Sequence, residues 1–400
     1  MNLTTGYPFG LINNGLPASY PKLESDVKTD VAIIGGGISG ALTAYYLGRA
    51  GMDCLLVDGR TIGLGSTCAS TSLLQYELDK PLYKLISQVG RQGAVRAYTL
   101  CSESIDQLEV ITSKIKFPHF ERRNSLYFAA GIKDVKGLKL EYHARKNAGF
   151  SVDYLENDAI RKQYGFSSPA GILSRQGAQT DAYLLTHALL QYGIQHGLNV
   201  FDRTRIAHIE YQRNGAKLKT LNGPVISARR LVNATGYEIT EFIDKQIVQL
   251  NSTYALVSEN ISPEISLWKD KALLWNTADP YLYMRLTRDK RIMIGGRDEP
   301  FYNPARRDKL INRKSVLLKK DFAKLFPHIE LLPEFRWTGT FGSTQDALPF
   351  IGAYDKTPHT YYALGFGGNG ITFSVIAAKI IRDLLTGRKN KDVGLFSFDR

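Results

Sequence analysis

Three glycines, Gly35, Gly37 and Gly40, are spaced as GxGxxG, and Asp58 follows them about 20 residues further along the chain. In such a motif the first glycine allows a tight turn, the second lets the backbone approach a pyrophosphate, and the third lets a helix pack closely on a strand. The carboxylate of Asp58 could accept hydrogen bonds from both hydroxyls of a ribose, which disfavours a 2′-phosphate. The spacing therefore predicts a dinucleotide site and disfavours NADP.

The elements predicted around this motif place the glycines at the start of a helix. Val31 to Ile34 is a short, apolar, β-branched run, typical of a strand that is buried on both faces. Small and apolar residues then recur at helical spacing, including Ala44 and Leu47, and a second predicted strand, Cys54 to Val57, ends at Asp58. The N-terminus of the intervening helix offers unpaired N–H groups and a positive dipole end to a diphosphate.

A second glycine-rich loop, Gly367-Gly368-Asn369-Gly370, lies near the C-terminus, between a predicted strand and a helix with an apolar face. That face runs from Phe373 to Leu384, and Gly387 is placed to end the helix. An enzyme that uses only NAD needs one such loop. The N1/C2=O edge of a flavin gains negative charge on reduction, and a positive helix end stabilises it. The second loop therefore favours FAD over NAD.

Length and composition indicate a globular enzyme-sized chain. It has 400 residues, of which 44% are hydrophobic, enough for a large core and for two interleaved domains. No run of about 18 apolar residues occurs, and the first ten residues lack both a basic and an apolar region, so we expect no membrane span, no secretory signal and a cytoplasmic location. The three cysteines form no CxxC motif, so we expect no metal site.

The charge of the chain is strongly basic, with a net value of +13. Such a charge favours anionic cofactors, substrates or surfaces through long-range steering. Basic residues concentrate between Arg306 and Lys324, where apolar residues recur at helical spacing. This pattern predicts one amphipathic helix with a solvated basic face. Nucleic-acid binding is disfavoured because no aromatic recognition motif accompanies the charge.

Further along the chain, alternating and apolar runs indicate more strands and helices. Residues 182 to 195 are predicted to form a helix, and a mostly helical stretch ends at about residue 115. Leu231 to Ala234 is typical of another buried strand, and it stops at Thr235-Gly236. Alternation between about 245 and 300 indicates an antiparallel sheet. A buried strand so far from the first predicts a sheet assembled from distant segments.

Several motifs together resemble one family. The Gly35 to Asp58 fingerprint, "VNATGYE", "IMIGGRDE", "TQDALPFIG" and the terminal "GFGGNGITFS" are similar to those of the D-amino-acid-oxidase-like FAD-dependent oxidoreductases, and in particular of glycine and sarcosine oxidases and γ-glutamylputrescine oxidoreductase. The resemblance implies an α/β fold with a Rossmann-like FAD-binding domain of the glutathione-reductase type, made of residues 20–80, 150–240 and 335–400. An α+β substrate-binding domain with an antiparallel sheet, residues 81–149 and 241–334, would be interleaved with it.

The resemblance also implies which residues hold FAD. The predicted set is Gly35, Gly37, Ile38, Ser39, Gly40, Asp58, Gly59, Arg60, Ser66, Thr67, Ile206, Ala234, Thr235, Gly236, Gly339, Gly367, Gly368, Asn369, Gly370, Ile371 and Thr372. The implied chemistry is removal of a hydride from the carbon next to an amine nitrogen, onto flavin N5, which leaves an imine that water hydrolyses. Positioning of the C–H bond then dominates catalysis, and a dedicated acid–base residue is not required.

The residues that would bind the substrate depart from the family pattern. Members that oxidise small amino acids hold the substrate carboxylate with cationic side chains, and the corresponding positions here are Gln75, Phe341 and Thr372. A small free amino acid is therefore disfavoured. Arg285 and Arg297 are candidate replacements, with surface or interdomain ion pairs as the alternative.

Aromatic residues on the predicted strands could supply a wall for an amine. Tyr254, Tyr283 and Trp275 are the candidates, although aromatics on strands often belong to the core. We expect the substrate side of the site to include Gln75, Tyr254, Tyr283, Arg285 and Thr372.

The electron acceptor is either oxygen or a redox partner. Met293 occupies the position at which oxygen-reactive members often carry a lysine, which favours a dehydrogenase. Cys68 could in principle form a thioether to flavin, but a buried unlinked thiol is the preferred interpretation. Two alternatives stay open for the reaction: a 2-hydroxy-acid or glycerol-phosphate type dehydrogenase on the same scaffold, and a flavoprotein that acts on RNA or serves as a subunit of a larger complex.

Overall fold

A mostly parallel sheet forms around the first glycine-rich loop. The computed structural model describes residues 1–241, 243, 247–262, 265 and 267–400. Across this sheet the strands are β17 (Phe350–Ala353), β18 (Thr360–Leu364), β11 (Val225–Asn233), β2 (Val27–Ile34), β3 (Cys54–Val57) and β8 (Asn199–Phe201). All neighbours from β18 to β8 are parallel, and β17 is antiparallel to β18. Segments from both ends of the chain thus meet in one sheet, as predicted.

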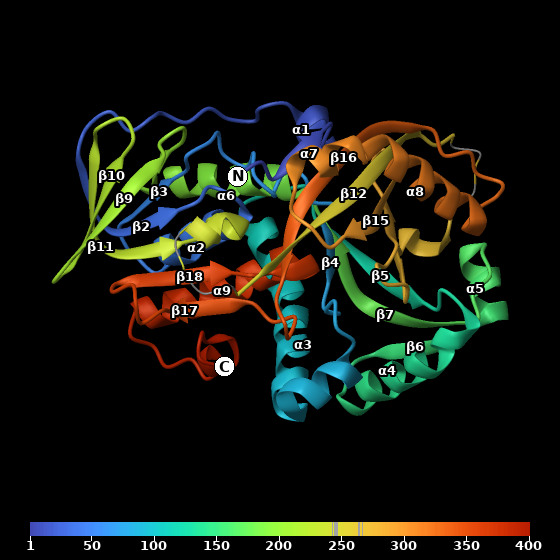
Figure 1. Cartoon of the computed structure of the whole chain (residues 1–400). Helices are drawn as coiled ribbons and strands as arrows, with labels where there is room; N and C mark the ends of the chain where they lie inside the picture. The colour runs from blue at the N-terminus through green and yellow to red at the C-terminus, as the bar shows by residue number, and fades with distance from the viewer. Residues whose placement is uncertain (242, 244–246, 263–264, 266) are drawn as a thin grey trace.

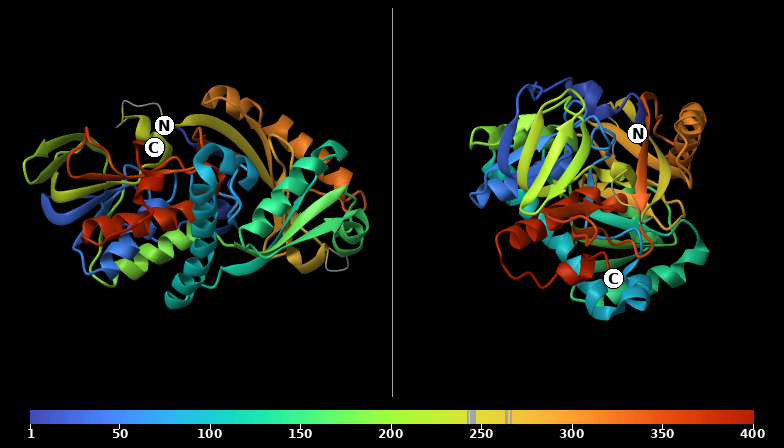
Figure 2. Two further views of the ribbon diagram at one scale, coloured as in Figure 1. Left: turned by 90° about the horizontal axis from the view of Figure 1, so that it is seen from below. Right: turned by 60° about the vertical axis from the view of Figure 1, so that its left-hand side comes forward.

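Three helices cover one face of this sheet: α2 (Ile38–Arg49), α6 (Ala182–Ile194) and α9 (Gly370–Leu385). In the left view of Figure 2 they lie side by side, in blue, green and red. The other face packs against β9 (Ile206–Gln212) and β10 (Gly215–Thr220), which form an antiparallel extension from β11. Strands such as β3 are therefore buried on both faces, which explains their continuous apolar sequences.

The second sheet is almost wholly antiparallel and lies to the right in Figure 1. Its strands follow the order β1 (Thr4–Gly6), β16 (Pro333–Ser343), β12 (Gln249–Asn260), β15 (Arg291–Glu299), β14 (Tyr283–Leu286), β13 (Leu273–Asn276), β5 (Glu121–Phe128), β7 (Ala170–Gln179) and β4 (Leu73–Gln75), and β6 (Val152–Glu156) pairs with β7. Among the strand pairs described in this sheet, only β13–β5 is parallel. This architecture confirms the predicted α/β fold with a Rossmann-like sheet and a second, antiparallel sheet.

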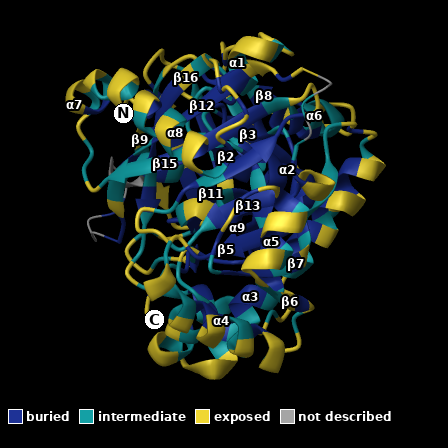
Figure 3. Ribbon diagram, turned by 90° about the vertical axis from the view of Figure 1, so that its right-hand side faces the viewer, coloured by how far each residue is buried: buried dark blue, intermediate teal, exposed yellow. Residues whose placement is uncertain are grey.

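The remaining α-helices pack around the two sheets and the three helices named above. They are α1 (Phe9–Asn14), α3 (Leu82–Lys114), α4 (Val135–Asn147), α5 (Asn157–Tyr164), α7 (Pro304–Lys309) and α8 (Ile311–Leu325). Figure 3 shows exposed residues concentrated on outer helices such as α4 and α5, with buried strands behind them. The basic segment predicted as one helix is instead divided into α7 and α8, which meet at Leu310. No helix among the described residues is both long and apolar enough to cross a membrane.

Several strands pair in a different sheet from the one that the predicted domain boundaries imply. β4, β6, β7 and β16 pair within the antiparallel sheet, although the sequence analysis assigned their residues, apart from the first two of β16, to the FAD-binding stretches. The pairing of β4 and β7 is set by hydrogen bonds between distant segments, with Gln75 opposite Gly177. The division of the chain into two domains at the stated boundaries stays a prediction.

Candidate functional site

A cavity of about 500 Å³ lies where the carboxyl ends of the parallel strands face the antiparallel sheet. From the parallel sheet it is lined by residues that end β2 and β3 or follow β8, β11 and β18. From the antiparallel sheet it is lined by residues of β4, β12, β14, β15 and β16. The carboxyl ends of parallel strands are the usual ligand site of an open α/β sheet.

The first glycine loop approaches its neighbours too closely for any side chain. Gly35 has a φ of +113°, and a Cβ there would lie 2.4 Å from the carbonyl oxygen of Ala234. A Cβ at Gly40 would lie 1.9 Å from the carbonyl oxygen of Gly35. Gly40 does not line the cavity, so its part in the site is to let α2 pack against the loop.

The N-terminus of α2 faces the cavity across Gly37. A Cβ at Gly37 would lie 2.9 Å from Oγ1 of Thr67, and that hydroxyl oxygen accepts a hydrogen bond of 3.1 Å from the backbone N–H of Ile38. The Ser39 and Ser374 hydroxyls hydrogen-bond at 2.7 Å and tie α2 to α9. This helix end suits an anionic diphosphate, because the N–H groups and the dipole of the helix point toward it.

Asp58 lies at the end of β3 and is held by two backbone N–H groups. Its Oδ2 accepts from Gly36 and its Oδ1 from Arg60, both at 2.7 Å. Burial nevertheless raises the pKa of Asp58. Its carboxylate keeps lone pairs for further donors, which a ribose would supply.

Arg60 and Glu238 form a bidentate ion pair beside Asp58, with both N–O distances 2.7 Å. Arg60 Nε and Ser66 Oγ are buried and have no hydrogen-bond partner among the described residues. Buried polar atoms without partners are costly, so these two atoms fit a site that a polar cofactor completes. Glu238 was not predicted, although it directly follows the "VNATGY" stretch.

The second glycine loop closes the opposite end of the cavity, which we call the ring end. The backbone N–H of Gly368 donates to Oδ2 of Asp79 at 2.8 Å. The side-chain amide of Asn369 donates to the carbonyl oxygens of Gln75, at 3.1 Å, and Glu77, at 2.8 Å. The loop before α9 is therefore fixed to the chain that follows β4.

Every predicted cofactor-binding residue except Gly40 lines the cavity. Among the predicted substrate-side residues, Gln75, Tyr283 and Thr372 line it as well. The Gln75 side chain donates to Oγ of Ser125 at 3.3 Å. The Thr372 hydroxyl donates to the carbonyl oxygen of Asn369 at 3.0 Å and so stabilises the start of α9.

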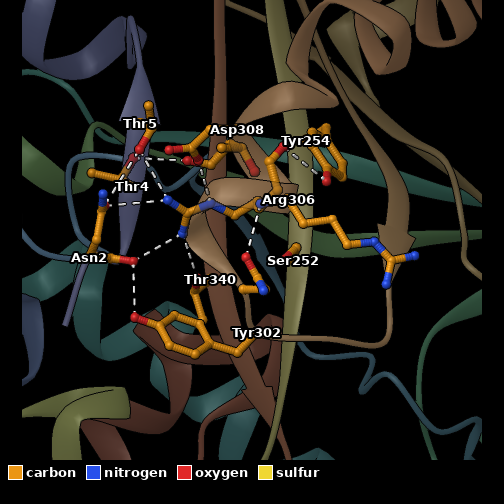
Figure 4. Close-up of polar contacts among 12 residues, drawn as sticks. Asn2, Thr4, Thr5, Ser252, Tyr254, Tyr302, Arg306, Asp308 and Thr340 are labelled. Carbon is orange, nitrogen blue, oxygen red and sulfur yellow. Dashed lines mark hydrogen bonds and ion pairs between the residues drawn. The ribbon is translucent and has the colours of Figure 1, made fainter.

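Tyr254 and Arg285 lie outside the cavity, contrary to the expectation that they border it. Because side chains alternate along β12, Thr253 faces the cavity and Tyr254 faces the core beneath α8. There its hydroxyl donates to the carbonyl oxygen of Arg307 at 3.4 Å, among the polar contacts of Figure 4. Arg285 is buried further along β14, where Nε donates to the carbonyl oxygen of Thr71 at 2.6 Å, and burial lowers its pKa to about 10.

Other candidates weighed in the sequence also face away from the cavity. Arg297 forms an ion pair with Asp321, with Nε 2.6 Å from Oδ2 and Nη2 2.5 Å from Oδ1. This is the alternative to substrate binding that the sequence left open for Arg297. Trp275 stacks on Tyr127 with ring centroids 3.9 Å apart. Met293 is buried against Trp337. Cys68 is buried, burial raises its pKa to about 12, and its thiol donates to the carbonyl oxygen of Gly65.

Four polar residues at the ring end were not predicted from the sequence. They are Asp79, Thr253, Tyr281 and Asp298, of which Thr253, Tyr281 and Asp298 line the cavity. The Tyr281 hydroxyl donates to Oδ1 of Asp79 at 3.0 Å. The pKa of Asp298 is raised to about 7, mainly by burial and also by the nearby charge of Asp79, although a hydrogen bond from Thr253 lowers it. The available signal for Asp298 was its place directly after the glycine pair and arginine that end an apolar strand, in "IMIGGRDE".

Charge divides the cavity into two ends. Among the described residues that line it, the arginine and lysine side chains are Arg60 and Arg205, and both lie at the dinucleotide end near Asp58 and Gly59. The ring end, as far as the structure describes it, presents carboxylates and hydroxyls but no cationic side chain.

Comparisons with known proteins point to one family. The family model for FAD-dependent oxidoreductases (DAO) matches residues 30–384. γ-Glutamylputrescine oxidoreductase of Escherichia coli is 23% identical over 92% of this chain and 86% of that protein. Glycine oxidase of Bacillus subtilis is 23% identical over 93% of this chain and 97% of that protein.

Solved structures share the fold at low sequence identity. Glycine oxidase from Geobacillus kaustophilus superposes with a TM-score of 0.78, at 18% identity, over 93% of this chain and 99% of that one. L-proline dehydrogenase from P. horikoshii also gives a TM-score of 0.78, at 19% identity, over 93% of this chain and 97% of that one.

Proposed function

Because the chain belongs to the family of FAD-dependent oxidoreductases, matched over residues 30–384, we propose that it oxidises the C–N bond of an amine or amino acid. The cofactor of this family is FAD, and the cavity fits it. Gly35, Gly37 and the start of α2 would hold the diphosphate, Asp58 the ribose, and the loop Gly367–Asn369 with α9 the flavin ring. The buried, unpartnered atoms of Arg60 and Ser66 lie along this path.

Bound FAD supplies the acceptor for a hydride that leaves the carbon next to the substrate nitrogen, and water then hydrolyses the resulting imine. The chain's own residues contribute orientation. The β12, β14 and β15 strands form a roof over the ring end, and Thr253, Tyr283 and Asp298 point from this roof into the cavity. A substrate held under that roof is shielded from water and has its C–H bond fixed in one direction, which is the main requirement of such a transfer.

One observation favours an amine as the substrate over a hydroxy acid or a glycerol phosphate. The ring end lacks a cationic side chain among its described residues and presents the carboxylate of Asp298. An anionic substrate placed there would lose its hydration without gaining a counter-charge. An amine gains one. The similar proteins include both a γ-glutamylputrescine oxidoreductase and a glycine oxidase, and the charge at the ring end favours an amine over an amino acid.

We further propose that electrons leave to a redox partner and that flavin is not covalently linked. Met293 lies on β15, carries no charge and is buried in a cluster with Trp337, so this position offers no lysine to activate oxygen. The thiol of Cys68 lies outside the cavity lining and is hydrogen-bonded. Release of all flavin from acid-precipitated protein, and slow reoxidation in air, are the expected results.

The test is an absorption spectrum of the purified protein, followed by anaerobic addition of amines, amino acids and 2-hydroxy acids. Bleaching of the flavin band at about 450 nm by amines supports the proposal. Bleaching by 2-hydroxy acids or glycerol phosphate alone would replace it with the alternative dehydrogenase. A protein that takes up no FAD would contradict the whole assignment.

A further inference from the structure

The ring end contains a cluster that we call the acidic pocket: Asp79, Thr253, Tyr281, Tyr283 and Asp298. Asp79 follows β4, Thr253 lies on β12, Tyr281 precedes β14, Tyr283 begins β14 and Asp298 lies on β15. Each oxygen of Asp79 already accepts one hydrogen bond, Oδ2 from the backbone N–H of Gly368 and Oδ1 from the hydroxyl of Tyr281. The acidity of this pocket contrasts with the net charge of +13 of the whole chain.

Asp298 forms a side-chain hydrogen bond with Thr253, but one of its two carboxylate oxygens has no partner. Its residue is half-buried, and its Oδ1 atom is shielded from solvent yet makes no hydrogen bond with any described residue. The nearby cation, Lys314, is already engaged, since Nζ donates to Oε1 of Glu299 at 2.6 Å and to the carbonyl oxygen of Arg297 at 2.7 Å. A buried carboxylate oxygen with no donor is unfavourable unless a ligand supplies one.

Two tyrosines lie near this carboxylate, whose charge adds to the effect of burial in raising the pKa of each phenol. Tyr281 and Tyr283 have ring centroids 5.8 Å apart. The ring of Tyr283 lies directly against Gly295, where a Cβ would come within 2.3 Å of the phenol oxygen. Glycine at that position therefore makes room for an aromatic wall beside Asp298. A carboxylate close to aromatic rings suits a substituted ammonium group, through charge and cation–π attraction.

We propose that Asp298 binds a positively charged nitrogen of the substrate, so that the preferred substrates are amines without a carboxylate on the reacting carbon. This inference rests on the proposed function, and it adds the substrate class and the residue that selects it. The aromatic walls from Tyr281 and Tyr283 pack around the alkyl groups on that nitrogen. A free α-amino acid would bring its carboxylate next to Asp298 and Asp79, where like charges repel.

The test measures binding without turnover, in the FAD-loaded enzyme. The probes are tetramethylammonium and pivalate, which have similar shapes and opposite charges, and neither can be oxidised to an imine. Each is titrated while the change in the flavin spectrum is recorded. We expect tetramethylammonium to bind at least about tenfold more tightly than pivalate, and D298N to weaken its binding by about tenfold or more, as for loss of a charged partner.

The matched control is D153N, which neutralises an exposed aspartate on β6 and should leave both dissociation constants unchanged. D298E, which keeps the charge, should retain a preference for the cation. Tighter binding of pivalate than of tetramethylammonium, or an unchanged cation affinity in D298N, would overturn the proposal. If D298N fails to load FAD, the proposal is tested by comparing the dissociation constants of tetramethylammonium and pivalate in the wild-type enzyme and in D298E. Failure of amines to reduce the flavin despite selective cation binding would instead count against the proposed reaction.

Discussion

The carboxylate of Asp79 accepts a hydrogen bond of 2.8 Å from the backbone N–H of Gly368 and thereby ties the chain after β4 to the loop that starts α9. The two segments are 289 residues apart in sequence. The same carboxylate accepts from Tyr281 on the antiparallel side at 3.0 Å. A single side chain thus joins the predicted flavin-ring loop to both the parallel and the antiparallel halves of the molecule.

Replacing Asp79 by alanine should weaken FAD binding more than it weakens the fold. Without the carboxylate, the N–H of Gly368 and the hydroxyl of Tyr281 lose their partner, and the loop before α9 is no longer held in position. We expect the dissociation constant for FAD to rise by about tenfold, from the loss of one or two charge-assisted hydrogen bonds. Quenching of FAD fluorescence on titration with apoprotein measures it. D153A is the control, and an equal effect of both variants would contradict the prediction.

Glycine-to-alanine substitutions should separate the packing role of Gly40 from the binding role of Gly37. G40A places a methyl group against the carbonyl oxygen of Gly35, where backbone must move, so we expect destabilisation of about 2 kcal/mol or more and loss of FAD. G37A meets only the Thr67 hydroxyl and fills the cavity, so the fold should survive while FAD binding falls by about tenfold or more.

The control for both glycine variants is G48A on the same helix. A Cβ at Gly48 meets nothing within 4 Å, so the alanine should leave FAD binding unchanged and stabilise α2 slightly. Circular dichroism reports the fold and a spectral titration reports FAD. If G37A and G48A bind FAD equally well, Gly37 does not lie against the cofactor.

The glycine loops illustrate what the sequence could predict. Both loops depend on local patterns, a β-branched strand, a spaced set of glycines and an apolar helix face, and each falls where it was expected. The α/β class was implied by the family resemblance, and the continuous apolar sequence of a buried parallel strand such as β3 agrees with it. The pairing of β4 and β7 in the antiparallel sheet could not be predicted, since it depends on which distant segments meet.

The substrate side shows where prediction from sequence stops. Thr253 and Tyr254 are neighbours, and alternation assigns them to opposite faces, but the sequence does not say which face borders the cavity. Tyr254 was predicted to border the cavity, whereas Thr253 is the residue that lines it. The place of Asp298 in the cavity was not predicted, for a related reason. Its significance comes from burial and from the absence of a partner for Oδ1, and both are properties of the assembled fold.

Arg145 should be a main stabilising residue of the interface between α4 and the chain after β4. It is fully buried, with Nη1 3.1 Å from Oε1 of Glu77 and Nε 2.7 Å from Oε1 of Glu141. R145M leaves two buried carboxylates unpaired, which typically costs about 3–5 kcal/mol. We expect a clear fall in melting temperature by differential scanning calorimetry of the FAD-loaded protein.

The comparison for Arg145 is R175M, which removes an arginine that is 71% exposed and pairs with Asp153 at 3.2 Å. An exposed ion pair contributes about 0–1 kcal/mol, so this variant should melt within experimental error of the wild type. The triple variant R145M/E77Q/E141Q removes all three charges and should recover part of the lost stability. Equal melting temperatures for R145M and R175M would show that the buried network is not stabilising.

Asp298 should make the stability of the protein depend on pH in the direction opposite to that of an ordinary ion-paired aspartate. The groups that face its carboxyl are Thr253 on β12, Asp79 after β4, Asp279 before β14 and Lys314 on α8. Burial is the largest effect and raises the pKa of Asp298. A hydrogen bond from Thr253 and the charge of Lys314 lower this pKa, and the two aspartates raise it. The folded-state pKa is about 7, whereas an exposed aspartate titrates near 4. Between these values the folded state binds the proton and the unfolded state does not.

The free energy of unfolding should therefore fall as pH rises from about 4 to about 7, by an amount on the order of 2 kcal/mol for a half-buried carboxyl. D298N cannot ionise, so its stability relative to the wild type should increase over that window and stay constant above about pH 8. Melting temperatures of both FAD-saturated proteins, measured across pH 5 to 8, give the comparison, with an expected relative shift of about 2 °C. The same titration governs the ligand: tetramethylammonium should bind more tightly as Asp298 ionises, and this pH dependence should vanish in D298N. A constant difference in melting temperature across the window would mean that Asp298 is ionised throughout, and its carboxylate would then have to be paired in the folded protein.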